Sequence, residues 1–309
     1  VLRFNAGGTA VVLKRHEKRR FLKGMANLLE PKRLTRIVEV GANPINVNPY
    51  SIIRNVGLCH VWGFEPGEKA FAKLKDLAPR ENVTFLPYAI GDGSQQIFHV
   101  TRSSALSSLL EPNEKTFDFL GRVHVPGTVD DRVPVETKRL DDIAELDGFD
   151  LLKVDVQGGE MMVFDGAARA LESALMVITE VAFVPIYRDQ PLLDEQMQRL
   201  RGHGFDLHKF MHLKSMNLRG GLGVRQDRVT NHRNQLIDGD AVFMRSLRDP
   251  EGMSDEQLKH LALLSLGVVD SYDVAVRCLE LLVDRGKISG QASRAFVKKL
   301  AALTNAPTL

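Results

Sequence analysis

The chain has 309 residues, of which 44% are hydrophobic and 26% charged, and its formal net charge is +2; this is enough for one α/β domain of about 200 residues and a smaller accessory part. The near-neutral charge excludes a general nucleic-acid-binding surface, and no apolar run approaches the roughly eighteen residues that span a bilayer. Two cysteines are too few for a disulfide scaffold or a cysteine metal site, and we expect a cytoplasmic protein.

Residues 1–35 are expected to form a basic N-terminal extension. Its positive charge is densest in residues 14–20, and because this cluster follows apolar residues instead of preceding them, we expect no secretory signal here. Residues 36–248 are predicted to form the main domain, and residues 249–309 a small C-terminal helical bundle.

Within the main domain, short apolar runs alternate with helical patterns, which predicts a mostly parallel sheet covered by helices on both faces. The expected strands are residues 37–40, 61–65, 83–90, 151–156 and 176–181, and the expected helices are residues 68–77, 159–171 and 192–203. Residues 96–101 and 133–139 are expected to form an inserted pair of strands, and residues 205–211 and 241–245 a closing antiparallel pair.

The C-terminal part has a different pattern. Ser254 to Gln257 form a capping box, which marks the start of a helix. Apolar residues then recur at helical spacing in three stretches, so we expect three helices. Their apolar stripes suit either a small core or a contact between copies of the chain, which leaves a homo-oligomer open.

Two strand ends carry the pattern of a nucleoside site. The first expected strand ends in VEVGAN, which contains Glu39, Gly41 and Asn43, and the second ends at Glu65 and Pro66. In a doubly wound sheet the ligand lies outside the carboxyl ends of the strands, where a glycine turn lets the backbone approach it and an acid accepts the ribose hydroxyls. The pattern therefore predicts a cofactor that contains adenosine, with Glu65 as the ribose acid.

The glycine turn favours one adenosine cofactor over another. A dinucleotide site has three glycines spaced as GxGxxG for the pyrophosphate, whereas this turn has Gly41 alone, with Ala42, Pro44 and Asn46 around it. A single glycine after Glu39 favours S-adenosylmethionine, whose ammonium group a carboxylate can hold. The alternatives are an NAD-linked oxidoreductase and an ordinary turn after a buried strand.

A third strand end has the same character. The segment LLKVDVQGGE, residues 151–160, reads as a buried strand that ends in Asp155, followed by a glycine pair and a helix start. Together with residues 181–191 and 240–245, this pattern resembles the FkbM family of S-adenosylmethionine-dependent methyltransferases. The resemblance covers residues 36–246 and is most specific in VEVGAN, in FEP ending at Pro66, in RLDD at residues 139–142, in LLKVDVQGGE and in residues 187–191.

The resemblance implies a doubly wound, Rossmann-like class I methyltransferase sheet, S-adenosylmethionine as the cofactor, and transfer of a methyl group to a hydroxyl. The acceptor that it implies is a secondary metabolite or a sugar, in a glycan, a lipopolysaccharide or a nucleotide-linked form. The chain departs from the family pattern at Pro44, where glycine is usual, and at Gln157, where glutamate is usual. A methyltransferase-like binding module without turnover is therefore a further alternative.

The predicted site residues lie at these strand ends. A hydroxyl acceptor must lose a proton, and we expect Asp155 to be the base, with Glu180 and then His212 as the next candidates. Asp155, Glu160 and Glu180 offer oxygen ligands for magnesium, but an acid in the first turn of a helix is favourable without a metal, and we predict none. The residues expected to bind the cofactor are Glu39, Gly41, Asn43, Glu65, Pro66, Ala89, Ile90 and Asp155.

A basic, glycine-rich segment follows later in the chain, and we expect it to be a long loop. A loop of about twenty residues inside a compact domain often covers a ligand, which favours an anionic acceptor such as a phosphorylated or nucleotide-linked sugar. A solvated surface loop is the alternative. The expected partner is thus a small-molecule or glycan acceptor and not a nucleic acid. The basic residues of this segment are His212, Lys214, Arg219, Arg225, Arg228 and Arg233.

Overall fold

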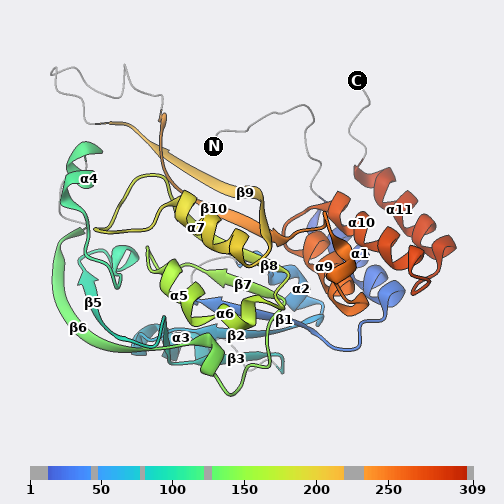
Figure 1. Ribbon diagram of the computed structural model, residues 1–309, viewed down its shortest axis with the longest axis horizontal. Helices are drawn as coiled ribbons and strands as arrows, with labels where there is room; N and C mark the ends of the chain where they lie inside the picture. Colours follow the sequence, from blue (N-terminus) through green and yellow to red (C-terminus); the bar gives the residue numbers. More distant parts are fainter. Residues whose placement is uncertain (1–12, 43–47, 77–80, 122–126, 219–232, 305–309) are drawn as a thin grey trace.

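The computed structural model describes residues 13–42, 48–76, 81–121, 127–218 and 233–304. Its main element is a seven-stranded sheet of order β3-β2-β1-β7-β8-β10-β9 (Figure 1). Antiparallel pairing joins β10 (Gln235–Arg245) to β8 on one side and to β9 (Phe205–Met216) on the other. The parallel strands are β1 (Thr35–Val40), β2 (Cys59–Phe64), β3 (Val83–Leu86), β7 (Leu151–Val154) and β8 (Met176–Ala182).

This strand order confirms the predicted doubly wound sheet with a closing antiparallel pair. The sheet grows from β1 through β2 to β3 on one side and through β7 to β8 on the other. At such a switch point the loops after the two central strands diverge and leave a crevice at the carboxyl ends of the strands. The connecting helices are α2 (Ser51–Asn55), α3 (Glu68–Asp76), α5 (Glu160–Gly166), α6 (Ala168–Leu171) and α7 (Leu193–Gly202).

Apolar side chains at successive strand positions bury both faces of the sheet. Ile37 and Leu151 pack into one core, and the adjacent residues Val38 and Leu152 pack into the other. Strands that are apolar on both faces are typical of a central parallel sheet. Figure 1 shows α5, α6 and α7 in front of the sheet, and buried residues of these helices complete the second core.

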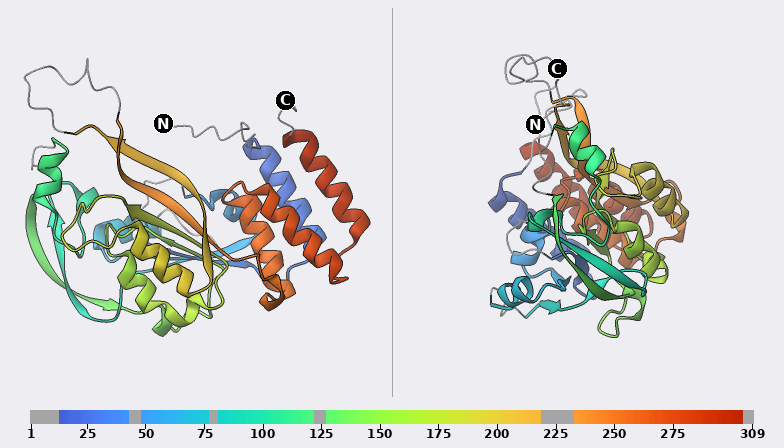
Figure 2. Two further views of the ribbon diagram at one scale, coloured as in Figure 1. Left: turned by 45° about the horizontal axis from the view of Figure 1, so that its top comes forward. Right: turned by 90° about the vertical axis from the view of Figure 1, so that its left-hand side faces the viewer.

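The first core joins the sheet to helices from the two ends of the described chain. The predicted C-terminal helices are α9 (Asp255–Gly267), α10 (Tyr272–Asp284) and α11 (Gly290–Thr304), and α1 (Arg15–Leu29) contacts α9 and α11 (Figure 2). The capping box is confirmed, because Ser254 Oγ accepts a hydrogen bond from Gln257 N at 3.2 Å. The three-part division of the chain stays a prediction. The basic extension nevertheless contains a helix that buries Phe21, Leu22, Met25 and Leu29.

An arm of two long strands extends from the sheet. β5 (Gln95–Thr101) and β6 (Val129–Lys138) are antiparallel, which confirms the inserted pair of strands. The expected single strand over residues 83–90 is wrong, because the chain divides at Pro87 into β3 and β4 (Ala89–Ile90), and β4 pairs with β6. Proline has no N–H for the ladder, so β3 ends there. The remaining short elements described are α4 (Glu114–Phe119) and 3-10 turns at Ser104–Leu106, Leu140–Asp142 and Pro250–Gly252.

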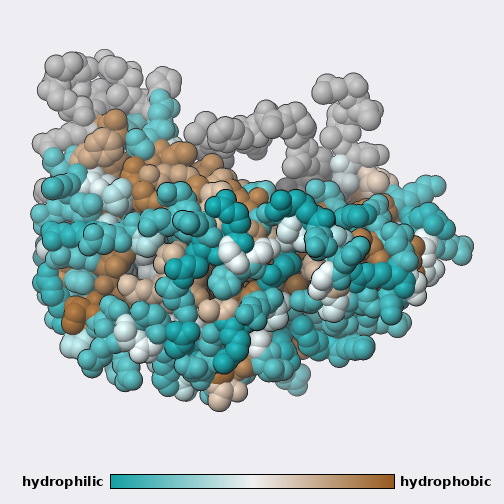
Figure 3. All heavy atoms as spheres, viewed as in Figure 1, coloured by the Kyte–Doolittle hydropathy of each residue, from teal (hydrophilic) through white to brown (hydrophobic). Residues whose placement is uncertain are grey.

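Some large apolar side chains are exposed at the end of the sheet that carries the arm. Figure 3 shows apolar residues gathered over β9 and beside the arm. The exposed side chains include Ile97 and Val133 on the arm, Phe119 on α4 and Met211 on β9. Within the described ranges, no helix is both long and apolar enough to cross a membrane.

Candidate active site

The carboxyl ends of β1, β2 and β7 are tied together by backbone hydrogen bonds. Gly41 N and Ala42 N donate to Phe64 O at 3.2 and 3.0 Å, and Asp155 N donates to Val40 O at 3.1 Å. Gly41 has a φ of +83°, and a Cβ on it would lie 2.0 Å from Asp155 O. Glycine alone allows this approach, so the turn first serves to join two protein segments. Its role in cofactor binding stays a prediction.

Glu39 is the buried acid beside this turn. The residue is 1% exposed, and its carboxylate accepts a hydrogen bond from Tyr50 OH. Burial raises the pKa of Glu39, and the positive charge of Lys153 opposes that rise. Glu39 Oε1 lies 3.3 Å from Lys153 Nζ, yet it accepts no well-aligned hydrogen bond from a described residue. Because Lys153 already places an ammonium group beside this oxygen, the role of Glu39 toward the ammonium group of S-adenosylmethionine stays a prediction.

Glu65 follows β2 at the same edge of the sheet. Its side chain is half-buried, and Oε1 accepts a hydrogen bond from Gly67 N at 2.7 Å. Burial raises the pKa of Glu65, and this hydrogen bond opposes the rise. A half-buried carboxylate after β2 is suited to accept ribose hydroxyls. The next residue, Pro66, is exposed.

The remaining predicted cofactor residues differ in what they can offer. Ala89 and Ile90 form β4. Ile90 is 5% exposed and packs into the second core, so it can offer a cofactor its backbone but not its side chain. Ala89 is half-buried. Asn43 lies outside the described residues.

Gln157 bridges the first two predicted bases. Its Nε2 donates to Asp155 Oδ1 at 2.9 Å and to Glu180 Oε2 at 3.0 Å, and its Oε1 accepts from Tyr187 OH at 3.2 Å. The Asp155 side chain is 30% exposed, so a substrate can reach it. Burial raises the pKa of Glu180 well above its ordinary value, and the negative charge of Asp155 adds to the rise. The fold therefore brings Asp155 and Glu180 together in one group.

Glu160 has a separate structural role at the start of α5. Its buried carboxylate accepts hydrogen bonds from Val156 N at 3.2 Å and from Gly158 N at 3.1 Å. Burial raises the pKa of Glu160 to about 7. It thus stabilises the turn that precedes the helix. Among the residues that the structure describes, no three His, Cys, Asp or Glu side chains are grouped as a metal ion would require.

The third predicted base, His212, lies two strands away from Glu180. Across β8, β10 and β9, Glu180 is opposite Asp240, and Asp240 is opposite His212. His212 is exposed. The structure therefore places His212 at the rim of the site and not beside Asp155.

The predicted basic loop is described only at its two ends. Arg219, Arg225 and Arg228 lie outside the described residues. Lys214 at the start of the segment pairs with Asp238 at 2.7 Å. A cover over an anionic acceptor stays a prediction.

Two residues that contact the site were not predicted from the sequence. Lys153 Nζ lies 3.3 Å from Glu39 Oε1 and 3.9 Å from Asp155 Oδ2, so its charge stabilises both carboxylates. The sequence could have indicated Lys153, because it is a charged residue inside an apolar strand. It also lies two positions before Asp155, so both side chains are on the same face. No comparable pattern marks Tyr50, the residue just before α2, whose hydroxyl donates a hydrogen bond to Glu39.

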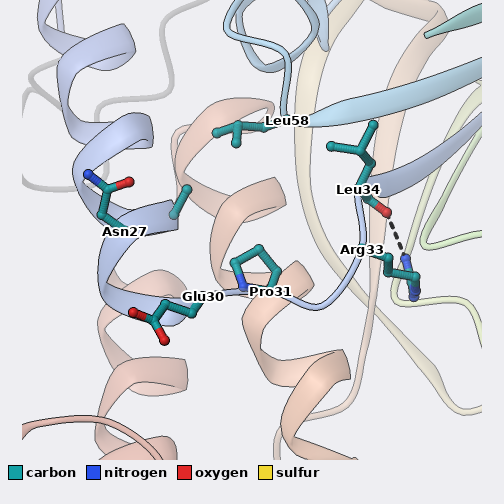
Figure 4. A pocket seen from close by; sticks show the side chains of 7 residues that line it. Asn27, Glu30, Pro31, Arg33, Leu34 and Leu58 are labelled. Atoms are coloured by element: carbon teal, nitrogen blue, oxygen red, sulfur yellow. Dashed lines mark hydrogen bonds between the residues drawn. The ribbon is translucent and has the colours of Figure 1, made fainter.

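A pocket of about 590 Å³ lies at the opposite edge of the sheet (Figure 4). It is lined by the end of α1, by the loop that leads to β1, and by Leu58 just before β2. The amino ends of parallel strands share one edge, so this pocket is remote from Gly41 and Asp155. Its Arg33 already donates to both carboxylate oxygens of Asp150, at 2.6 and 2.8 Å. We assign this pocket no part in the reaction.

A smaller pocket of about 220 Å³ lies where the arm meets the loop after β8. Arg132 and Arg188 line it, and each pairs with Glu111 at 2.9 Å. Arg188 N also donates to Glu111 O at 2.8 Å, which fixes the two segments side by side. Tyr187, the residue before Arg188, donates a hydrogen bond to Gln157 Oε1, so the loop after β8 contributes both to this pocket and to the group that contains Asp155.

The model of the methyltransferase FkbM domain matches residues 39–207, which include Glu39, Asp155 and Glu180. The chain is 29% identical over 148 residues to the 2-O-methyltransferase NoeI of Sinorhizobium fredii, a match that covers 43% of this chain and 56% of that protein. The chain thus spans only about half the length of this relative.

The chain also matches solved methyltransferase structures at low sequence identity. Precorrin-6y C5,15-methyltransferase from Geobacter metallireducens is 11% identical, with a TM-score of 0.34 and coverage of 77% of this chain and 93% of that chain. A putative S-adenosylmethionine dependent methyltransferase from Listeria monocytogenes is 9% identical, with a TM-score of 0.37 and coverage of 75% of this chain and 100% of that chain. The family match, which spans more than half of the chain, decides the assignment. The chain belongs to the FkbM family of S-adenosylmethionine-dependent methyltransferases.

Proposed function

We propose that this chain transfers a methyl group from S-adenosylmethionine to a hydroxyl group of a sugar, in a glycan, a lipopolysaccharide or a nucleotide-linked form. The observation that carries the proposal is the partly exposed carboxylate of Asp155, which lies after β7 and directly beside the Gly41 turn. A similar protein is named a 2-O-methyltransferase, which supports oxygen as the accepting atom. A secondary metabolite with a comparable hydroxyl is the second candidate acceptor.

The cofactor brings an activated methyl group, so the protein must align the acceptor and remove the hydroxyl proton. Asp155 is the best placed base, because its carboxylate is reachable from solvent. One oxygen accepts from Gln157 and the other lies near Lys153, but each carboxylate oxygen can accept more than one hydrogen bond. Glu180 is the second candidate base, because it shares the Gln157 donor with Asp155, and burial raises its pKa.

Two alternatives fit the site less well. A dinucleotide-linked oxidoreductase requires glycines that the turn lacks, because the GxGxxG spacing counted from Gly41 reaches Asn43 and Asn46. A binding module without turnover would be expected to lose its reactive carboxylates. Here the departure at Gln157 leaves Asp155 and Glu180 in place and hydrogen-bonded.

The polar pocket between the arm and the loop after β8 supports a hydroxyl-rich acceptor. Arg132, Arg188 and Glu111 give it hydrogen-bond donors and acceptors, the groups that orient a polar ligand. Asp155 and Glu180 concentrate negative charge at the reaction centre. An anionic acceptor would therefore have to hold its phosphate away from them.

Label transfer tests this proposal. The protein is incubated with S-adenosylmethionine that carries a trideuteromethyl group and with three acceptor sets: neutral oligosaccharides, phosphorylated or nucleotide-linked sugars, and hydroxylated secondary metabolites. We expect mass spectrometry to find one deuterated methyl ether on a sugar hydroxyl, and to find it strongly reduced with Asp155→Asn. Transfer confined to the metabolite set, or to nitrogen or sulfur atoms, would contradict a sugar hydroxyl as acceptor.

A further inference from the structure

Gln157 has a backbone conformation that residues with a side chain rarely adopt. Its φ is +58°, and that of the following Gly158 is +98°. Contacts hold this turn on both sides: Ser108 Oγ donates to Gln157 O at 2.6 Å, and Gly158 N donates to Glu160 Oε1 at 3.1 Å. Glycine would adopt the same φ without strain. What glutamine adds at this position is therefore its side chain.

The side-chain amide of Gln157 has one orientation that satisfies its neighbours. A carboxylate can only accept hydrogen bonds, so the NH2 group must face Asp155 and Glu180. Its Nε2 bonds both of them, at 2.9 and 3.0 Å, and its Oε1 is left to accept from Tyr187 OH at 3.2 Å. The amide thus uses both of its N–H groups and its oxygen.

This amide lies where two negative groups approach each other. Because a single nitrogen bonds both carboxylates, the two bonded oxygens lie within about 6 Å of one another. Like charges at that separation repel, and a shared donor offsets the repulsion. The other charged or titratable groups that face the pair are Glu39 on β1, Glu160 on α5, Asp238 and Asp240 on β10, Lys153 on β7 and Tyr187.

We propose that Gln157 is a positioning residue for methyl transfer: its amide fixes the Asp155 carboxylate in the orientation in which it accepts the proton of the acceptor hydroxyl. The assignment of the base to Asp155 rests on the proposed function. Tyr187 and Ser108 hold Gln157 in turn, and Ser108 belongs to the segment between β5 and β6. Through Gln157, the arm beside the polar pocket is connected to the base.

Gln157→Gly tests this role, because glycine accepts the φ of +58° and the substitution removes the amide. We expect the affinity for S-adenosylhomocysteine to stay close to that of the wild type. The urea midpoint of unfolding should fall, because Asp155, Glu180 and Tyr187 each lose a hydrogen-bond partner. Methyl transfer should be slower by about 10- to 100-fold, the usual effect of misplacing a reacting group. The midpoint of the pH–rate profile should move to higher pH, because a lost hydrogen bond to a carboxylate disfavours its ionised form. An unchanged rate and midpoint would overturn the proposal.

Gln196→Ala is the matched control, since Gln196 is also an amide beside Glu180. Its Nε2 donates to the backbone oxygen of Glu180 at 3.0 Å, and its Oε1 accepts from Thr179 Oγ1 at 3.1 Å. It does not bond a candidate base, so we expect a lower urea midpoint with an unchanged midpoint of the pH–rate profile. If Gln157→Gly gave this same pattern, its role would be structural and the proposal would be wrong.

A measurement without an acceptor separates this inference from the proposed function. In ¹³C-labelled protein, the side-chain carboxyl resonance of Glu180, assigned through Glu180→Gln, is followed against pH. We expect its midpoint to rise in Gln157→Gly, because the variant lacks the donor at 3.0 Å. If the midpoint rises but the wild-type protein methylates no acceptor, the effect of the Gln157 amide on the carboxylates is supported and the proposed function is contradicted. An unshifted resonance would overturn the positioning role.

Discussion

Replacing Gly41 with alanine tests the geometry on which the site depends. A Cβ at this position would lie 2.0 Å from Asp155 O, whereas Cβ atoms essentially never approach another atom within 3.0 Å, so one segment must move by about 1 Å. The φ of +83° adds roughly 1–2 kcal/mol for a residue with a Cβ. We expect the free energy of unfolding to fall by about 3–4 kcal/mol in total.

Gly57→Ala is the control for this variant. Gly57 has a similar φ of +75°, but nothing lies within 4 Å of the place where its Cβ would be. We expect it to lose about 1 kcal/mol, because only the backbone conformation opposes the substitution. Urea denaturation of both variants without cofactor gives the difference, which measures the contact with Asp155. Equal losses would refute the close approach as the reason for glycine at position 41.

Gly41→Ala should also lose affinity for S-adenosylhomocysteine. The displaced segments carry Glu39 and Asp155, two residues predicted to bind the cofactor. Calorimetry at a temperature where Gly41→Ala remains folded measures this loss. Full affinity in a destabilised variant would leave Gly41 with a structural role alone.

Three further substitutions test single residues. Glu65→Ala should weaken binding of S-adenosylhomocysteine by about 1.5–3 kcal/mol in calorimetry, the worth of a hydrogen bond to a charged group; unchanged affinity in a folded variant would remove Glu65 from the cofactor site. Asp155→Asn should slow methyl transfer by about 10²–10⁴-fold and keep cofactor affinity; a loss confined to affinity would point to Glu180 as the base. Burial raises the pKa of Glu160 from 4.5 to about 7, so its contribution to stability is complete below pH 4.5 and is lost as the pH rises through 7. In the wild type, the free energy of unfolding from urea denaturation should therefore fall by about 3 kcal/mol over this pH range, and Glu160→Gln should not show this fall. A fall of equal size in the variant would show that Glu160 does not cause it.

The parallel sheet was predictable because its central strands are buried on both faces. Runs such as residues 37–40 and 151–154 must then be apolar at every position or nearly so. The division at Pro87 was missed, because an apolar run does not show which partner strand each half pairs with. α1 was hidden by its basic residues, although its buried side chains recur every three or four positions.

The site was predictable as far as it is built from strand ends. Parallel strands end at one edge of a sheet, so Glu39, Glu65 and Asp155 were expected together before any contact was known. The role of Gln157 was not predictable, because it depends on a left-handed backbone conformation and on contacts from segments far apart in the chain. At the level of the sequence, this position showed only the absence of a carboxylate.

Hydrogen–deuterium exchange with S-adenosylhomocysteine tests most directly whether the cofactor lies at the carboxyl edge of the sheet. We predict slower exchange on ligand addition in peptides that cover residues 39–42, 63–67 and 153–159. Peptides that cover residues 26–34, which contribute to the pocket at the amino edge, should exchange as before. Slower exchange confined to residues 26–34, with the strand ends unchanged, would contradict this placement of the cofactor.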